Sequence, residues 1–144
     1  VNGKFTPAQR EIYDIVLESL ETSLRLYRPG TSIQEVTGEV VRIMITGLVK
    51  LGILHGDVDQ LITENAHRPF FMHGLSHWLG LDVHDVGDYK VGGEWRVLEP
   101  GMAMTVEPGI YLPGKLGVRI EDVLYLTPEG CQNLTLAPKE LVIL

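Results

Sequence analysis

Three residues in the second half of the chain have the side-chain types of a metal-dependent hydrolytic site. His77 lies in the glycine-rich run 73–80, Glu107 precedes a Pro-Gly pair, and Glu121 follows an Arg-Ile pair. Two carboxylates and one imidazole form a hard donor set, which suits Mn, Mg, Fe or Co better than a thiolate-type zinc site does. The residue types therefore point to a metal centre that activates water.

The positions of the two glutamates allow a second interpretation. Glu107 ends an apolar run at 103–106, and a carboxylate is costly to bury there unless it is paired or bound to a cation. Strand ends are also where a rigid scaffold can hold a reactive group in place. Alternatively, Arg119, Glu121 and Asp122 form a surface ion-pair cluster, and Glu107 is a solvated strand end. Spacing alone leaves both interpretations open.

Three histidines lie four and seven residues apart in irregular, glycine-rich chain: His73, His77 and His84. Imidazole is a common metal ligand and proton carrier, and irregular segments on a scaffold often carry function. One of the three can still be a structural histidine. His55 and His67 are expected to be ordinary polar positions.

The first half of the chain predicts three helices that act as scaffold. Each begins at a capping residue, and the first two carry the full capping-box pattern. Apolar residues then recur at helical spacing. The expected helices run from Thr6 to the Pro-Gly pair at 29–30, from Ser32 to Gly52, and from Asp57 to about Asn65.

The second half predicts strands. Apolar, β-branched runs separated by Pro-Gly and Pro-Glu-Gly turns indicate strands at 103–106, 118–120 and 123–126, with 141–144 as a further strand or a buried tail. Helices followed by strands favour an α+β fold over alternating βαβ units. Since no repeat or linker divides the chain, we expect one domain.

Bulk composition excludes several classes of partner. The 144 residues carry a net charge of −7 without a basic run, which argues against binding nucleic acid or an anionic membrane surface. Cys131 is the single cysteine, so no intrachain disulfide is possible. No apolar stretch of membrane-spanning length and no signal segment is visible, which favours a cytoplasmic protein. Because the sequence begins at Val1 in a polar stretch, we expect a piece of a longer protein.

Three segments resemble, in order, the signature stretches of the creatinase/aminopeptidase, or pita-bread, metallopeptidases. They are 73–85, 106–109 and 119–122, and the first is most similar to the Xaa-Pro aminopeptidases (aminopeptidase P) of bacteria. The opening stretch 1–72 is similar to the same subfamily. The resemblance implies that residues 1–144 are a partial metallopeptidase catalytic domain, the carboxy-terminal part of a pita-bread domain with helices followed by a curved antiparallel sheet.

The resemblance also implies a function and a cofactor. The expected enzyme is a metal-dependent aminopeptidase that releases the N-terminal residue from peptides with proline in second position. Two divalent metal ions, expected to be Mn²⁺, would activate the attacking hydroxide. The full-length protein is expected to be a homo-oligomer.

Roles for individual residues follow from the same resemblance. The metal ligands would be His77, Glu107 and Glu121, with Glu107 also acting as general base or acid. His73 and His84 would line the substrate site and stabilise the oxyanion or pass protons. Arg119 would orient the site from behind its ligands, and Tyr111 would lie near the pocket for proline.

Two departures from the family pattern limit these expectations. In the family, two aspartate ligands, a further histidine and a separate amino-terminal domain lie upstream of the segment that Val1 matches. None of these is present in residues 1–144. We therefore expect weak or no metal binding, little activity, exposed apolar surface and a tendency to associate. The short turn at 112–118 is more similar to prolidases, which cleave Xaa-Pro dipeptides. A non-catalytic pita-bread binding module is a third alternative, although such a module has no chemical need for His77, Glu107 and Glu121 together.

Overall fold

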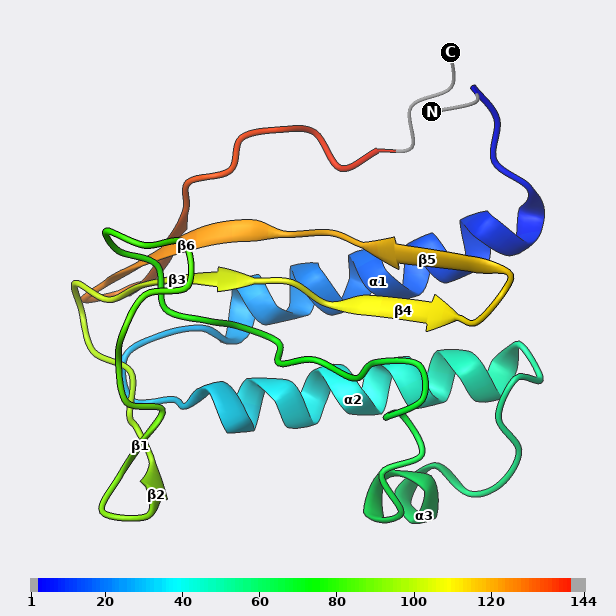
Figure 1. Cartoon of the computed structure of the whole chain (residues 1–144), viewed down its shortest axis with the longest axis horizontal. Helices are drawn as coiled ribbons and strands as arrows, with labels where there is room; N and C mark the ends of the chain where they lie inside the picture. The colour runs from blue at the N-terminus through cyan, green and yellow to red at the C-terminus, as the bar shows by residue number, and fades with distance from the viewer. Residues whose placement is uncertain (1–2, 141–144) are drawn as a thin grey trace.

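The computed structural model describes residues 3–140 and has the expected α+β architecture, helices first and antiparallel strands after them (Figure 1). The expected strand or tail at 141–144 lies outside the described residues. The elements are α1 Pro7–Leu26, α2 Ile33–Lys50, α3 Val58–Thr63, β1 Lys90–Val91, β2 Glu94–Trp95, β3 Ala103–Val106, β4 Gly109–Leu112, β5 Leu116–Arg119, β6 Asp122–Thr127 and β7 Gly130–Asn133.

The two long helices begin at capping boxes, as the sequence predicted. At the start of α1, Gln9 N donates to Thr6 Oγ1 at 3.2 Å, and Thr6 N donates to Gln9 Oε1 at 2.8 Å. Ser32 and Glu35 repeat this exchange at the start of α2. Each box satisfies backbone donors that the first turn of a helix leaves unpaired.

Two helices end in left-handed residues. Gly52, with φ of 67°, follows α2 and confirms the predicted stop. The helix α3, expected to run to about Asn65, ends at Thr63, because Asn65 itself takes a φ of 56°. The Ala66 amide then donates to Leu61 O at 2.9 Å, which closes a Schellman motif.

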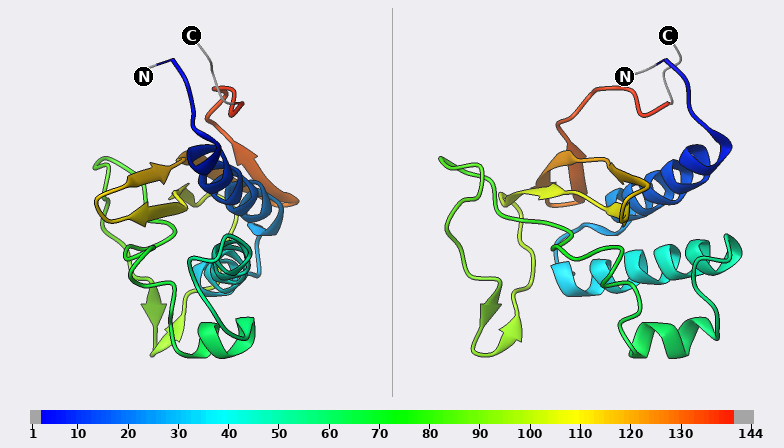
Figure 2. Two further views of the ribbon diagram at one scale, coloured as in Figure 1. Left: turned by 90° about the vertical axis from the view of Figure 1, so that its right-hand side faces the viewer. Right: turned by 45° about the vertical axis from the view of Figure 1, so that its right-hand side comes forward.

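The helix α1 is central, since it contacts α2 on one side and the strands β4, β5 and β7 on the other (Figures 1 and 2). The two long helices run antiparallel. They approach closely where Gly47 of α2 meets Ile15 of α1, because a Cβ atom at position 47 would lie 2.6 Å from Ile15 Cδ1. Buried apolar side chains from both layers form one core, including Leu20, Met44 and Leu124.

Two glycines of α2 should respond in opposite ways to the same substitution. Gly47→Ala is expected to lower the free energy of unfolding by about 1–3 kcal/mol, because the added methyl group overpacks the contact with Ile15. Gly38→Ala is the matched control: a Cβ atom at position 38 meets no atom within 4 Å. It should raise the free energy of unfolding by about 0.5–1 kcal/mol. Urea unfolding of both variants measures the difference, and equal effects would contradict the packing argument.

The strands β3 to β6 form one long antiparallel hairpin with a bend. The β3–β6 ladder ends where Val106 pairs with Asp122, and the β4–β5 ladder begins where Gly109 pairs with Arg119. Between these pairs the ladder is interrupted at Pro108, which has no amide hydrogen to donate. The strand expected at 118–120 is therefore β5, Leu116–Arg119, and it ends at this interruption.

Several strands were not expected from the sequence. The hairpin partner β4 begins at Gly109, where the Pro108-Gly109 pair predicts a turn. The strand β7 pairs with the far edge of β6, and the short β1–β2 hairpin projects from the body of the molecule (Figure 1). The expected strands at 103–106 and 123–126 are confirmed as β3 and the centre of β6.

A segment without a strand label extends this sheet on the other edge of β3. The amide of Thr105 donates to His77 O at 2.9 Å, and the amide of Glu107 donates to Leu75 O at 2.8 Å. An isolated bridge joins Trp78 to Met104. The histidine-rich segment is thus held against β3 by backbone hydrogen bonds, opposite the edge that pairs with β6.

Large apolar side chains are exposed at several places. Leu81, Val86 and Leu136 are at least 90% exposed, and Tyr125 projects from β6. This exposure agrees with the expectation of uncovered apolar surface, and association of the isolated chain stays a prediction. Among the described residues, no helix combines the length and the apolar character that crossing a membrane requires.

Candidate metal centre

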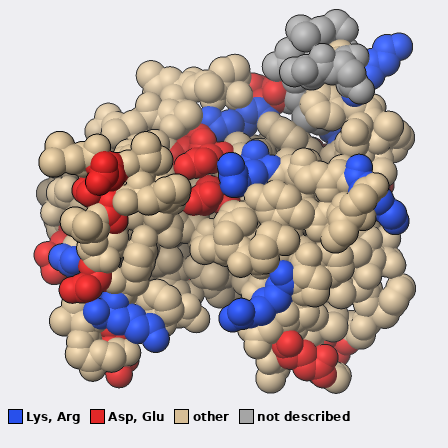
Figure 3. Space-filling view, viewed as in Figure 1, with Lys and Arg blue, Asp and Glu red and all other residues tan. Residues whose placement is uncertain are grey.

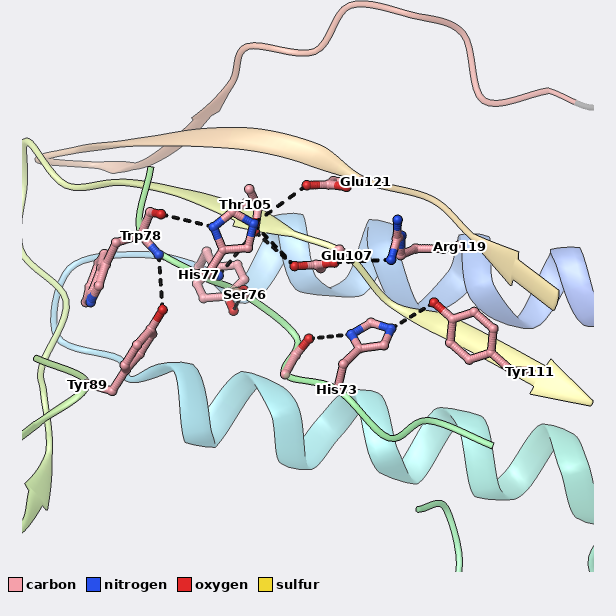
Figure 4. Close-up of polar contacts among 12 residues, drawn as sticks. His73, Ser76, His77, Trp78, Tyr89, Thr105, Glu107, Tyr111, Arg119 and Glu121 are labelled. Carbon is pink, nitrogen blue, oxygen red and sulfur yellow. Dashed lines mark hydrogen bonds and ion pairs between the residues drawn. The ribbon is translucent and has the colours of Figure 1, made fainter. Parts of the chain in front are cut away.

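The interruption of the long hairpin places the two glutamates opposite each other. Glu107 follows β3 and Glu121 precedes β6, so both leave the ladder at the same bend. His77 reaches them from the neighbouring segment (Figure 4). Its Nε2 lies 3.5 Å from Glu107 Oε1 and 3.9 Å from Glu121 Oε1. One ligand atom from each of the three residues lies within 4.8 Å of the others.

Backbone contacts fix the orientation of the His77 ring. Its Nδ1 lies 3.0 Å from Trp78 O, and because a carbonyl only accepts, Nδ1 carries the hydrogen in the neutral ring. The lone pair of Nε2 then faces the two carboxylates. The hydroxyl of Thr105 accepts from the His77 amide at 3.1 Å and donates to Glu107 Oε1 at 3.5 Å.

The donor set fits a divalent cation. Three Lewis-basic atoms converge; Glu107 is only 14% and His77 only 13% exposed, so solvent screens these two little, whereas Glu121 is 38% exposed. A cation that accepts carboxylate oxygen and imidazole nitrogen, such as Mn²⁺, would neutralise this cluster. The tautomer of His77, held by a backbone carbonyl, is a common way to orient a metal-binding imidazole.

Arg119 approaches the cluster from the far side. Its Nη1 lies 4.0 Å from Glu107 Oε2, the carboxylate oxygen that does not face His77. The Arg119 side chain is about half exposed, so this ion pair contributes little to stability. It restrains how the Glu107 carboxylate is turned.

His73 and Tyr111 form a second polar pair beside the cluster (Figure 4). His73 Nδ1 lies 2.8 Å from Gly74 O and therefore donates, and Nε2 lies 2.9 Å from the Tyr111 hydroxyl. Both ring nitrogens of the neutral imidazole are thus occupied. Tyr111 lies over two glycines, since Cβ atoms at positions 109 and 117 would come within 2.8 Å and 2.9 Å of its side chain.

His84 lies differently from His73. Its ring stands against that of His77, with centroids 4.3 Å apart. Within residues 3–140, no hydrogen bond occupies its ring nitrogens. His84 therefore has free donor and acceptor capacity beside the metal-binding cluster.

These residues line a cleft of about 780 Å³. His73, His77, His84, Glu107 and Arg119 all contribute to its wall, whereas Tyr111 and Glu121 are not among its lining residues. Figure 3 shows acidic and basic side chains side by side on this hollowed face. The start of α2 and the β1–β2 region complete the cleft through residues that include Ile33, Gln34, Thr37, Tyr89 and Trp95.

The structure adds residues that the sequence pattern did not single out. Thr105 links His77 to Glu107, and a polar residue within the apolar run of β3 was the available signal. Tyr89 is not a ligand or proton carrier in this site. Its ring stacks on Trp78 with centroids 5.6 Å apart, and its hydroxyl accepts from the Trp78 amide at 3.3 Å. Since Trp78 carries the carbonyl that holds His77, this contact supports the site indirectly.

Gly117→Ala is expected to displace Tyr111 and free His73. Gly117 pairs with Tyr111 across the β4–β5 ladder, and the added methyl group would lie 2.9 Å from Tyr111 Cδ1. The free energy of unfolding should fall by about 1 kcal/mol or more. The imidazole NMR signals of His73 should also lose the signature of the Tyr111 hydrogen bond. Gly130→Ala, where a Cβ atom meets nothing within 4 Å, should leave those signals unchanged.

Comparison with known proteins places this geometry in a family. Residues 1–128 match metallopeptidase family M24. The Xaa-Pro aminopeptidase of Escherichia coli is 71% identical over 94% of this chain, and that of Haemophilus influenzae is 53% identical over 98%. The chain spans only 32% and 35% of the lengths of these two relatives.

A solved structure gives the same result. The zinc-substituted aminopeptidase P of E. coli in complex with product superposes with a TM-score of 0.90, at 70% identity over 94% of this chain and 32% of that chain. The fold is therefore the corresponding part of the pita-bread fold, as the resemblance implied. The chain belongs to metallopeptidase family M24.

Proposed function

We propose that this chain carries part of the active site of a metal-dependent aminopeptidase, which releases the N-terminal residue from peptides with proline in second position. The observation that carries the proposal is the convergence of His77, Glu107 and Glu121 beside a cleft large enough for a peptide. The similarity to two Xaa-Pro aminopeptidases supports the substrate class.

Two divalent ions are part of the proposal, with His77, Glu107 and Glu121 as the ligands that this chain contributes. When bound, such ions lower the pKa of a coordinated water and polarise the scissile carbonyl. Mn²⁺ is the expected ion because the donor set is rich in carboxylate oxygen.

Glu107 is proposed to hold the proton that the attacking water loses and then to pass it to the leaving amine. Its two oxygens face different partners: Oε1 lies toward His77 and Thr105, and Oε2 lies toward Arg119. Arg119 and Thr105 keep the carboxylate turned toward the cluster. This orientation places the proton-carrying group at the point where the ligands converge.

The two further histidines are proposed to have different tasks. His84 has unoccupied ring nitrogens in the cleft and can donate to the oxyanion of the tetrahedral intermediate or pass a proton. His73 is held by Gly74 and Tyr111, so it lines the substrate site as a fixed wall. Tyr111, whose ring meets that of His73 edge to face, is proposed to lie near the pocket for proline.

The experiment uses the longest natural polypeptide that contains this sequence as the enzyme and compares substrates of two lengths. Manganese-dependent release of the first residue is measured for an Xaa-Pro-Xaa tripeptide and for the corresponding Xaa-Pro dipeptide. Faster cleavage of the tripeptide supports the aminopeptidase. Faster cleavage of the dipeptide identifies a prolidase instead, and no hydrolysis of either peptide favours a binding module.

A further inference from the structure

The cleft does not end at the histidines. A second pocket of about 430 Å³ continues it between α2 and the segment that follows α3. The two cavities share five lining residues: Gln34, Thr37, Arg68, His73 and Gly74. Because the shared residues include His73, the second pocket begins directly beside the proposed substrate site.

In an aminopeptidase, a cavity that continues the substrate cleft can hold the part of the substrate that leaves after cleavage. The enzyme cuts after the first residue, so the part of the substrate on the amino-terminal side of the scissile bond is a single residue. The proline and everything after it belong to the leaving peptide. A pocket that extends the cleft is therefore suited to residues after the proline, which a dipeptide does not have.

The only permanent charge among the residues that line the second pocket is positive. Arg68 is the one lining residue with a permanent charge, and no Asp or Glu lines this pocket. Among residues 3–140, no ion pair or side-chain hydrogen bond holds the Arg68 guanidinium. The neighbouring His67 has its pKa lowered by burial and by Arg68, so that imidazole stays neutral near pH 7. An unpaired guanidinium in a chain of net charge −7 favours an anionic ligand.

The helical wall of the pocket is open. Gly38 of α2 lines it, and a Cβ atom at this position would meet no atom within 4 Å. Gln34, one turn earlier, belongs to both cavities and has a side-chain amide that can bond a peptide backbone. The absence of a side chain at Gly38 thus leaves room where an extended peptide would pass.

We propose that the second pocket is a subsite for the leaving peptide, and that Arg68 at its junction with the cleft selects substrates with a carboxylate at the third or fourth residue. This inference rests on the proposed aminopeptidase function and adds a substrate preference to it. It also favours peptides over Xaa-Pro dipeptides.

The first test removes the charge of Arg68. In the longest natural polypeptide that contains this sequence, Arg68→Gln should raise KM about tenfold for Xaa-Pro peptides with glutamate at the third or fourth residue, with kcat nearly unchanged. The matching glutamine peptides and the Xaa-Pro dipeptide should show little change. Arg10→Gln is the control, because Arg10 pairs with Asp14 on α1 and lies outside both cavities.

The second test fills the pocket. Gly38→Leu should raise KM for peptides of four or more residues and leave the dipeptide unaffected, because its side chain would project into the pocket. Gly38→Ala is the control for helix stability. Like Gly38→Leu it should stabilise α2, but its single methyl group leaves most of the pocket open, so its KM values should stay unchanged. Retained hydrolysis of the Xaa-Pro-Xaa tripeptide in Gly38→Leu shows that the variant is folded.

The outcomes separate this inference from the proposed function. An equal loss on every peptide in Arg68→Gln, the dipeptide included, would overturn the subsite and make Arg68 a structural residue. Unchanged KM values in both Arg68→Gln and Gly38→Leu would also overturn it. If the unmodified protein cleaves no peptide at all, the aminopeptidase itself is wrong, and a peptide-binding role would have to be measured directly.

Discussion

Glu107→Gln should lower kcat for the hydrolysis of an Xaa-Pro peptide by about a thousandfold in the longest natural polypeptide that contains this sequence. The amide keeps the shape of the side chain but removes its charge, so it can neither hold the proton of the attacking water nor bind a cation as strongly. The environment sharpens the effect, because Glu107 is only 14% exposed and, within residues 3–140, no other carboxylate lies nearer to His77 Nε2.

The control for this variant is Glu129→Gln, at an exposed turn before β7. Its kcat should equal that of the unmodified protein. Steady-state kinetics at saturating manganese separates the proton role from metal loss, since an ion defect alone would be relieved by more metal. Full activity of Glu107→Gln would refute the assigned role.

The helical half of the fold was predictable because its determinants are local. Thr6 with Gln9, and Ser32 with Glu35, specify helix starts by contacts three residues apart, and the structure contains both. Gly52 likewise specified a stop through its own backbone conformation. The end of α3 was placed two residues late, because an asparagine in the left-handed region gives a weaker signal than glycine.

The strands were harder to predict because their partners are distant in sequence. Pro108-Gly109 looks like a turn locally, yet Gly109 opens β4 and pairs with Arg119 ten residues later. The bend itself was invisible for the same reason. It is the bend that turns Glu107 and Glu121 toward each other, so the sequence supplied the ligands but not the way they meet.

The candidate site was also predictable only in part: its ligands were, and the contacts that orient them were not. His77, Glu107 and Glu121 were identified by residue type and by family resemblance, and the structure brings them together. The Trp78 carbonyl that fixes the His77 tautomer and the extension of the cleft to Arg68 were not identified. A main-chain carbonyl leaves no mark on the sequence, and an unpaired arginine is recognised only when its neighbours are known.

This chain by itself should retain at most one manganese ion, and loosely. Among its described residues, only His77, Glu107 and Glu121 converge as ligands. Manganese in an oxygen-rich site prefers six ligands, so three protein donors leave half of its coordination to water. A second ion would have to share the same carboxylates without any ligand of its own. The measurement is metal content per chain after manganese loading and gel filtration.

Two histidine variants decide whether a retained ion is held at the proposed place. His77→Ala should abolish retention, because it removes the one nitrogen donor from the cluster. His55→Ala, an exposed histidine outside both cavities, should retain as much manganese as the unmodified chain. Two tightly held ions per chain would show that a dinuclear site assembles from these three residues, and the argument from ligand number would be wrong. Unchanged manganese retention in His77→Ala would instead place the ion outside the cluster of His77, Glu107 and Glu121.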